Sequence, residues 1–327
     1  MRGAYRFAKL ALLAGLASAA VLVHPLAGAQ QLTKVRVSTI PVIDAAPLHA
    51  AIARGYFAEQ GLEVDTTPSV GGAVGLPAVA AGQIQIALSN IVSIILGAKE
   101  GLGFQMIASS SATGDAPPNS AGLVARKGSN FKNGKQLEGK RVVVNTRNSI
   151  NWLVVREWVQ LTGGDPERLI FLEVPFPQMM DTVRGGSGDA AFMVDPFLSA
   201  GIANGTTELV GWPYDTIMKR LPIAQYAATK SYIDANPGVI ERWVRAYNKG
   251  IDWVNQNKGS EEWFKLVSGF TRLTPEQLKN LAVPVWDKTI DPSAVERIIG
   301  VMRKHGLLDA SIDPKTLLYR TATEVVR

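Results

Sequence analysis

Cysteine is absent from all 327 residues of the chain. Without thiols the protein cannot form disulfides, thiolate zinc sites or iron–sulfur clusters, and it cannot use a cysteine nucleophile. Histidine is scarce, with three residues in the chain, and the signatures H-E-x-x-H, G-x-S-x-G and the P-loop are missing. Two glycine-rich stretches, 71–75 and 184–188, lack the spacing of a dinucleotide fingerprint and are interpreted as turns and helix ends. We therefore expect no enzyme activity, no cofactor and no metal.

A strong charge of one sign is also lacking. The formal net charge is +6, and three of these charges come from Arg2, Arg6 and Lys9 at the very start of the chain. The remaining Lys and Arg residues form no cluster, so nucleic acid is not expected as a partner. No apolar run beyond residue 30 reaches the eighteen or so residues of a membrane span.

The first 29 residues have the pattern of a secretory signal. The basic residues above precede an apolar run, Leu10–Val23, and Ala27-Gly28-Ala29 supplies a small-x-small cleavage site. A membrane anchor is the alternative, but fourteen residues span only about 21 Å of a hydrocarbon core of roughly 30 Å. Since no cysteine follows the run, a lipobox anchor is excluded. We predict a cleaved signal peptide over 1–29 and a periplasmic product.

After the signal, strand-like and helix-like segments alternate, which predicts an α/β fold with mostly parallel sheets. The expected strands of the first half are 35–40, 62–67, 84–88 and 104–108, and the expected helices are 47–57, 74–81 and 91–98. The second half repeats this order, with strands at 141–145, 169–174 and 190–194 and helices at 148–161 and 176–184. Residues 82–88 even resemble residues 186–192 in sequence. The chain therefore reads as two similar α/β units.

From Lys230 onward only helices are expected. Ile240, Trp243, Tyr247 and Val254 belong to an apolar stripe on one long helix that Pro237 helps to begin. Further helices are predicted at 261–268, 275–281, 293–304 and 314–323, packed over the first lobe. The resulting prediction is lobe I from residues 30–116 and 216–327, including the helical tail, and lobe II from residues 117–215.

The candidate binding site follows from the ends of the strands. In parallel α/β sheets, ligands bind beyond the carboxyl ends of strands, where helix N-termini present free N–H groups. The residues at these positions are mostly neutral and rich in hydroxyls and amides, with Arg147 as the one cation. The predicted ligand-binding set is Ile43, Asp44, Ala46, Pro47, Gly72, Ser89, Asn90, Ser110, Asn145, Arg147, Asn148, Ser149, Asp195 and Trp212.

Each of these side chains also has a structural interpretation. Ser, Asn and Asp before helices are ordinary caps, and Asp195-Pro196 is typical of an N-cap followed by a first-turn proline. Arg147 could be a solvated surface charge, and Trp212 could pack in a core. Asp44 would repel an anion, so it would bind a donor group or point away from the ligand.

Four segments resemble a known family. They are Gly55–Val64, Ala81–Ala87, Leu137–Val144 and Gly188–Phe192. Together they resemble the periplasmic substrate-binding proteins of ABC transporters, closest to the nitrate, sulfonate, taurine and thiamine-pyrimidine-precursor group. The resemblance implies a two-lobed type II periplasmic-binding fold, a monomer, and delivery to an inner-membrane permease powered by an ATPase. It also implies ligand contacts at 43–47, 89–90 and 148–149, while the lack of cysteine departs from the pyrimidine-synthesising relatives.

The leading hypothesis is a binding protein that closes around a small organic anion, such as a sulfonate or a carboxylate. The predicted hinge lies near Thr113–Ser120 and Gly211–Gln225. A neutral heterocycle, such as a pyrimidine or flavin precursor, is the next candidate. An exported enzyme on the same scaffold is a third possibility, with Asp44 and His49 as its only acid–base pair. A sensory subunit that serves a receptor instead of a permease also remains open.

Overall fold

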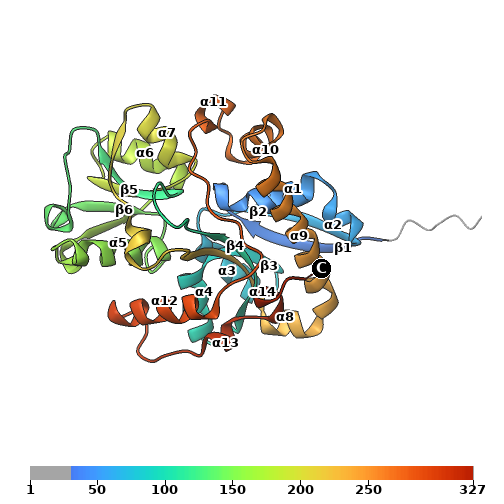
Figure 1. Cartoon of the computed structure of the whole chain (residues 1–327). Coiled ribbons are helices and arrows are strands. Elements are labelled where there is room, and N and C mark those ends of the chain that lie inside the picture. Colours follow the sequence, from blue (N-terminus) through green and yellow to red (C-terminus); the bar gives the residue numbers. More distant parts are fainter. Residues whose placement is uncertain (1–30, 327) are drawn as a thin grey trace, which may run out of the picture. The chain divides into compact units, whose positions relative to one another are not determined.

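A computed structural model describes residues 31–326, and the signal peptide predicted over 1–29 lies outside the described residues (Figure 1). The first sheet has the strand order β2-β1-β3-β10-β4. Its strands are β1 (Thr33–Thr39), β2 (Leu62–Pro68), β3 (Ile86–Asn90), β4 (Phe104–Ala112) and β10 (Pro222–Thr229). β1 pairs in parallel with β2 and β3, and β10 runs antiparallel to both of its neighbours.

The second sheet repeats this plan, with the order β7-β6-β8-β5-β9. Its strands are β5 (Ala121–Arg126), β6 (Arg141–Val144), β7 (Ile170–Glu173), β8 (Ala190–Val194) and β9 (Thr207–Gly211). Here β5 is the reversed strand, and it pairs with β8 and β9. The mostly parallel sheets expected from the sequence are confirmed, each with one antiparallel strand inserted.

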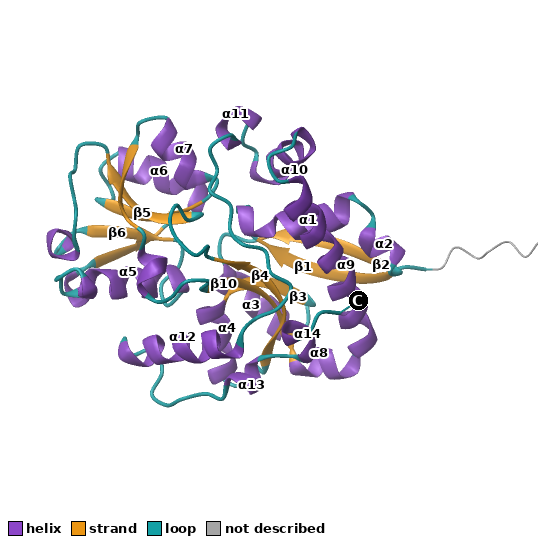
Figure 2. Cartoon of the chain, in the orientation of Figure 1, coloured by secondary structure: helices purple, strands orange, loops and turns teal. Residues whose placement is uncertain are grey.

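Helices follow most strands of both sheets (Figure 2). They are α1 (Ala46–Ala53), α2 (Tyr56–Glu59), α3 (Gly72–Ala80), α4 (Ile91–Lys99), α5 (Ile150–Leu161), α6 (Phe176–Arg184) and α7 (Phe197–Ala203), with 3-10 turns η1 (Ile43–Ala45), η2 (Gly134–Leu137), η3 (Pro166–Arg168) and η4 (Pro213–Thr216). The prediction of a single helix over 47–57 is wrong, because the helix is interrupted at Gly55. That glycine has a φ of 73°, a left-handed conformation that ends α1 before α2 begins.

The C-terminal part is helical, as predicted. It comprises α8 (Lys230–Ala235), α9 (Pro237–Asn257), α10 (Glu261–Thr271), α11 (Pro275–Leu278), α12 (Pro292–Lys304), α13 (Pro314–Leu317) and α14 (Arg320–Thr323). The predicted stripe of α9 is buried, and Trp243 and Tyr247 stack on each other with Tyr226 of β10 at their edges. The helix expected over 314–323 is two short helices, because the backbone between them is extended and the N–H of Tyr319 bonds to Met106 in β4.

The tail was expected to pack over the first lobe, and it also contacts α5, which lies between β6 and β7 of the second sheet in the sequence. α9 packs on α1, while Lys304 and His305 at the end of α12 bind Glu157 of α5. The Lys304 ammonium lies 2.7 Å from one Glu157 carboxylate oxygen, so an ion pair connects the tail to α5. None of the helices between residues 31 and 326 is long and apolar enough to cross a bilayer.

Three strands were not predicted: β5, β9 and β10. β5 and β10 are the strands that receive the chain when it crosses from one sheet to the other, through residues 113–120 and 212–221. These crossings match the predicted hinge segments in position. The lobe boundaries near 116 and 215 and the hinge motion itself stay predictions.

Candidate functional site

A small cavity lies between the two sheets, at the carboxyl ends of β1, β3, β6 and β8. Its volume is about 40 Å³, close to the roughly 30 Å³ that one water occupies in the liquid. Its lining residues come from both sheets and are Ile40, Val42, Asp44, Gly72, Leu88, Ser89, Asn90, Asn145, Ile150, Asn151, Phe176, Val194, Tyr214, Ile223 and Ala224. The walls are therefore largely apolar, with six polar side chains among them.

Asp44 is the one carboxyl side chain among the described residues that line the cavity. It lies in η1 directly after β1, and its side chain is 3% exposed. The hydroxyl of Ser111 donates a hydrogen bond to its carboxylate, and the Ser110 hydroxyl donates to its backbone carbonyl at 2.9 Å. Burial raises the pKa of Asp44, and the Ser111 hydrogen bond offsets only part of this effect. No Lys, Arg or His is among the described residues that line the cavity, so this carboxylate has no counter-ion there.

Asn90 joins the two halves of the cavity. It is the N-cap of α4, where its Oδ1 accepts a hydrogen bond from the N–H of Ser93 at 3.0 Å. The same oxygen accepts a second hydrogen bond, also at 3.0 Å, from the N–H of Ile150 in the first turn of α5. One side chain therefore caps a helix of the first sheet and binds the start of a helix that packs on the second.

Three polar side chains form a hydrogen-bonded chain on the side of the cavity that faces the second sheet. The Tyr214 hydroxyl donates to Asn151 Oδ1 at 2.7 Å, and Asn151 Nδ2 donates to Asn145 Oδ1 at 2.8 Å. This order fixes both amides and leaves the amide nitrogen of Asn145 as a donor. Across the cavity, the fully buried hydroxyl of Ser89 has no hydrogen-bond partner among the described residues. The site thus offers free donors and acceptors beside the Asp44 carboxylate.

Gly72, at the start of α3, makes room for this arrangement. A Cβ built on Gly72 would lie 2.7 Å from both the Cα and the Oγ of Ser89. Such contacts are too short for real atoms, so only glycine lets α3 approach β3 this closely. The close approach brings the N-terminal turn of α3 to the edge of the cavity.

Five of the predicted ligand-binding residues line the cavity: Asp44, Gly72, Ser89, Asn90 and Asn145. The other nine do not line it. Ile43, Ala46 and Pro47 are buried core residues beside Asp44, Ser110 bonds to the Asp44 backbone, Asn148 is an exposed turn residue with φ of 53°, and Ser149 is the N-cap of α5. Trp212 packs over Gly122, and Arg147 and Asp195 have the contacts described next.

Arg147 lies on the surface, at the end of β6. Its guanidinium donates to the backbone carbonyl of Phe171 at 2.6 Å and lies 3.5 Å from the Glu173 carboxylate. The side chain is 57% exposed. The cation that the sequence placed in the site therefore faces solvent beside β7.

Asp195 is a buried junction between the second sheet and the tail. Its carboxylate accepts hydrogen bonds from the N–H and the hydroxyl of Ser199 at 2.8 and 3.0 Å, and from the N–H of Ala282 at 2.9 Å. Its backbone carbonyl accepts from the N–H of Ile43 at 3.0 Å. Burial is the main cause that raises the pKa of Asp195 to about 7. Asp195 thus bonds to residues of both lobes without lining the cavity. The expected N-cap also differs, because Pro196 occupies the cap position of α7.

Asp44 and His49 do not share a cavity. His49 lies in α1 and lines a separate groove with α10, where its ring stacks on Phe270. The only acid–base pair that the sequence offered is therefore split between two sites. Within residues 31–326, no three His, Asp or Glu side chains converge where they could hold a metal ion.

Several lining residues were missed at the sequence level. Asn151 is one turn beyond the predicted start of α5. Tyr214, which the sequence offers beside Trp212 as an aromatic that could stack on a ligand ring, was left out of the predicted set. The sequence does carry a signal for Asn151, because it is a polar residue between the apolar Ile150 and Trp152 of the predicted helix. In the structure it is 4% exposed, and polar residues are unusual at such buried positions. Ile223 and Ala224 belong to β10, so missing that strand also removed them from the predicted site.

Comparison with known proteins gives a consistent family assignment. Residues 42–259 match the family model described as NMT1/THI5 like. A formylaminopyrimidine-binding protein of Halalkalibacterium halodurans is 24% identical over 212 residues, which are 64% of this chain and 62% of that protein.

Solved structures share the fold at low sequence identity. The alkanesulfonate-binding protein SsuA of Xanthomonas axonopodis pv. citri, bound to MOPS, superposes with a TM-score of 0.75 at 12% identity, covering 88% of this chain and 99% of that one. The ligand-binding component of an ABC-type import system from Staphylococcus aureus gives a TM-score of 0.76 at 13% identity, covering 90% and 99% of the two chains. The expected periplasmic-binding-protein fold is thereby confirmed.

Proposed function

Because this chain belongs to the NMT1/THI5-like family, whose model it matches over more than half of its length, we propose that it captures a small solute for an ABC importer and delivers it to an inner-membrane permease. The proposal rests on a cavity that both sheets line, at the ends of their strands. The named relative and the solved structures described above are binding proteins, and the separation of Asp44 from His49 gives no support to an enzyme on this scaffold.

Capture requires the two lobes to separate. Ligand sites usually enclose roughly 300–1,000 Å³, whereas the cavity has about 40 Å³. Opening can occur about the two crossing segments, 113–120 and 212–221, while each sheet keeps its own hydrogen bonds. The hydrogen bond from Ile150 to Asn90 spans the two lobes, so it would break on opening and form again on closure.

The class of ligand is inferred from Asp44, which is the observation that carries the choice of ligand. It is the one carboxyl or basic side chain among the described residues of the lining, and it is buried without a counter-ion. An anion here would require Asp44 to be protonated, because no Lys, Arg or His of the described residues lines the cavity and the Arg147 guanidinium binds Phe171 and Glu173 at the surface. A ligand that donates N–H groups would satisfy Asp44 instead.

We therefore favour a neutral or weakly basic nitrogen heterocycle over the sulfonate or carboxylate that the sequence first suggested. The rings of Phe176 and Tyr214 line the same cavity and offer apolar faces for a planar ligand. Asn145 and Ser89 would bind its ring nitrogens and substituents. The ligand in the name of the Halalkalibacterium halodurans relative belongs to this chemical class, which supports the choice.

Export and a monomeric state complete the proposal. They rest on the signal pattern of residues 1–29 and on the family resemblance. A periplasmic location would give the protein access to solutes before they reach the permease.

Isothermal titration calorimetry tests the ligand class. Titrations of the purified protein with 4-aminopyrimidine, cytosine and butanesulfonate at pH 7 should give saturable heats for at least one heterocycle and none for the sulfonate. Tight binding of butanesulfonate with no heat from either heterocycle would refute this ligand class and restore the anion hypothesis.

A further inference from the structure

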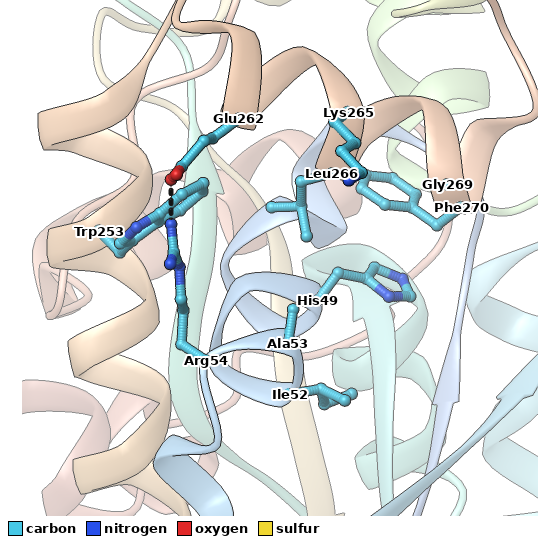
Figure 3. A pocket seen from close by; sticks show the side chains of 10 residues that line it. All are labelled: His49, Ile52, Ala53, Arg54, Trp253, Glu262, Lys265, Leu266, Gly269 and Phe270. Carbon is cyan, nitrogen blue, oxygen red and sulfur yellow. Dashed lines mark hydrogen bonds and ion pairs between the residues drawn. The ribbon is translucent and has the colours of Figure 1, made fainter.

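A second and larger cavity lies outside the site described above. It is a groove between α1, the end of α9 and α10, with a volume of about 610 Å³, and it shares no lining residue with the cavity between the sheets (Figure 3). That volume is within the range of small-molecule sites. The proposed function does not use this groove.

One end of the groove is built from a charged pair on an aromatic ring. Arg54 forms an ion pair with Glu262, and its guanidinium lies 4.6 Å from the centre of the Trp253 ring (Figure 3). Because the two charges neutralise each other, this end contributes shape more than net charge. The cation–π contact also holds the Arg54 side chain against Trp253.

The other end is aromatic. The rings of His49 and Phe270 stack face to face with centroids 4.2 Å apart and planes inclined by 6°, so α1 and α10 contact each other through these rings at this end of the groove (Figure 3). Burial lowers the pKa of His49 to about 4, and the imidazole is therefore neutral at pH 7. Its ring nitrogens form no hydrogen bond with any other residue in the described part of the chain. They are free to donate to or accept from a molecule in the groove.

α10 contributes a lysine, Lys265, and a glycine, Gly269, to the lining of the groove. Lys265 has no ion pair or hydrogen bond with any residue of the described range, and it lines the groove. Gly269 is one turn further along α10, in the interior of the helix, where glycine costs about 1 kcal/mol relative to alanine. A Cβ at this position would meet nothing within 4 Å. Packing therefore does not explain this glycine, and its absent side chain widens the groove.

We propose that this groove is a second ligand site that takes a small aromatic monoanion, such as an aryl carboxylate. With Arg54 and Glu262 paired and His49 neutral, Lys265 leaves the groove with one positive charge. The ligand ring would lie against the apolar wall of Leu266 and Phe270, and its carboxylate would bind Lys265. This charge is opposite to that of the cavity between the sheets, so the two sites select different chemistry.

Benzoate and benzamide provide the first test, because they share a shape and differ in charge. Calorimetric titration should give saturable benzoate binding that is at least tenfold tighter than benzamide binding. Lys265→Met should weaken benzoate binding by roughly tenfold, the loss of one charge-assisted contact. Lys219→Met removes an exposed lysine without a partner among the described residues and should leave benzoate binding unchanged.

Gly269→Leu tests the groove by shape alone. The new side chain enters open space, so the variant should keep its thermal midpoint and lose benzoate binding. If Gly269→Leu does not fold, Lys265→Met still decides. The proposal is overturned if benzoate does not bind at millimolar concentration, if benzamide binds equally well, or if Lys265→Met binds benzoate like the wild type.

Discussion

The Oδ1 atom of Asn90 accepts hydrogen bonds from two helix starts at once, from Ser93 in α4 and from Ile150 in α5, each at 3.0 Å. The first bond lies within the unit built on the first sheet, and the second spans the two units. A residue expected to touch ligand therefore also holds the two lobes together.

This double role predicts a specific phenotype for Asn90→Ala. Loss of the cap should lower the free energy of unfolding by about 1 kcal/mol, and loss of the bond to Ile150 should favour an open arrangement of the lobes. Small-angle X-ray scattering of the ligand-free variant should show a larger radius of gyration than the wild type. Ser260→Ala is the matched control, because the Ser260 hydroxyl caps α10 by accepting a hydrogen bond from the N–H of Trp263 in the same helix. Equal radii for the two variants would show that Asn90 does not hold the lobes.

Two glycine substitutions should have opposite effects on stability. Gly72→Ala forces a Cβ against Ser89 and should destabilise the fold by about 1–3 kcal/mol, as overpacking does. Gly300→Ala lies inside α12 with open space around its Cβ and should stabilise the fold by about 0.5–1 kcal/mol. Urea unfolding measures both. A Gly72→Ala protein as stable as the wild type would mean that α3 can move away from β3 at little cost.

His49 should make stability depend on pH. Its pKa is about 4 in the folded chain and 6.5 when unperturbed, so the unfolded chain binds the proton first as pH falls. The contribution of His49 is therefore complete above pH 6.5 and is lost between pH 6.5 and about 4, by up to about 3 kcal/mol. Asp195 acts in the opposite sense: its raised pKa of about 7 makes stability fall as pH rises from about 4 to 7.

The difference between wild type and His49→Gln separates these two effects. Asp195 is present in both proteins, so its contribution cancels, and the lost ring stack on Phe270 gives an offset that does not vary with pH. Chemical denaturation at half-unit steps from pH 4 to 7.5 should show the wild-type advantage shrinking as pH falls. A constant difference over this range would mean that His49 is as easily protonated in the folded state as in the unfolded one.

The strands and helices that were predicted correctly are those with strong local signals. α6 begins at Phe176 and ends at Arg184 as expected. β10 escaped prediction because its eight residues are all buried and include small and polar side chains, so they show no alternation. Its partners, β3 and β4, lie more than a hundred residues earlier, and no local pattern reports that pairing.

Five of the fifteen residues that line the candidate site were predicted from the sequence. The rule that ligands bind at strand ends identified Asp44, Ser89, Asn90 and Asn145, because these positions follow from strand order alone. The rule could not tell which way a side chain points. Arg147 follows β6 like its neighbour Asn145, yet its guanidinium turns outward to Phe171 and Glu173. That orientation reverses the electrostatic character of the site and the expected ligand.

The most direct test is therefore calorimetric titration of Asp44→Asn with the heterocycle that binds the wild-type protein most tightly. Asparagine keeps the shape of the side chain but removes its charge, so affinity should fall by roughly tenfold or more if Asp44 accepts an N–H of the ligand. Asp115→Asn, at an exposed position in the 113–120 crossing, should bind like the wild type. An Asp44→Asn protein that retains wild-type affinity for the heterocycle, or a wild-type protein that prefers butanesulfonate, would contradict the account.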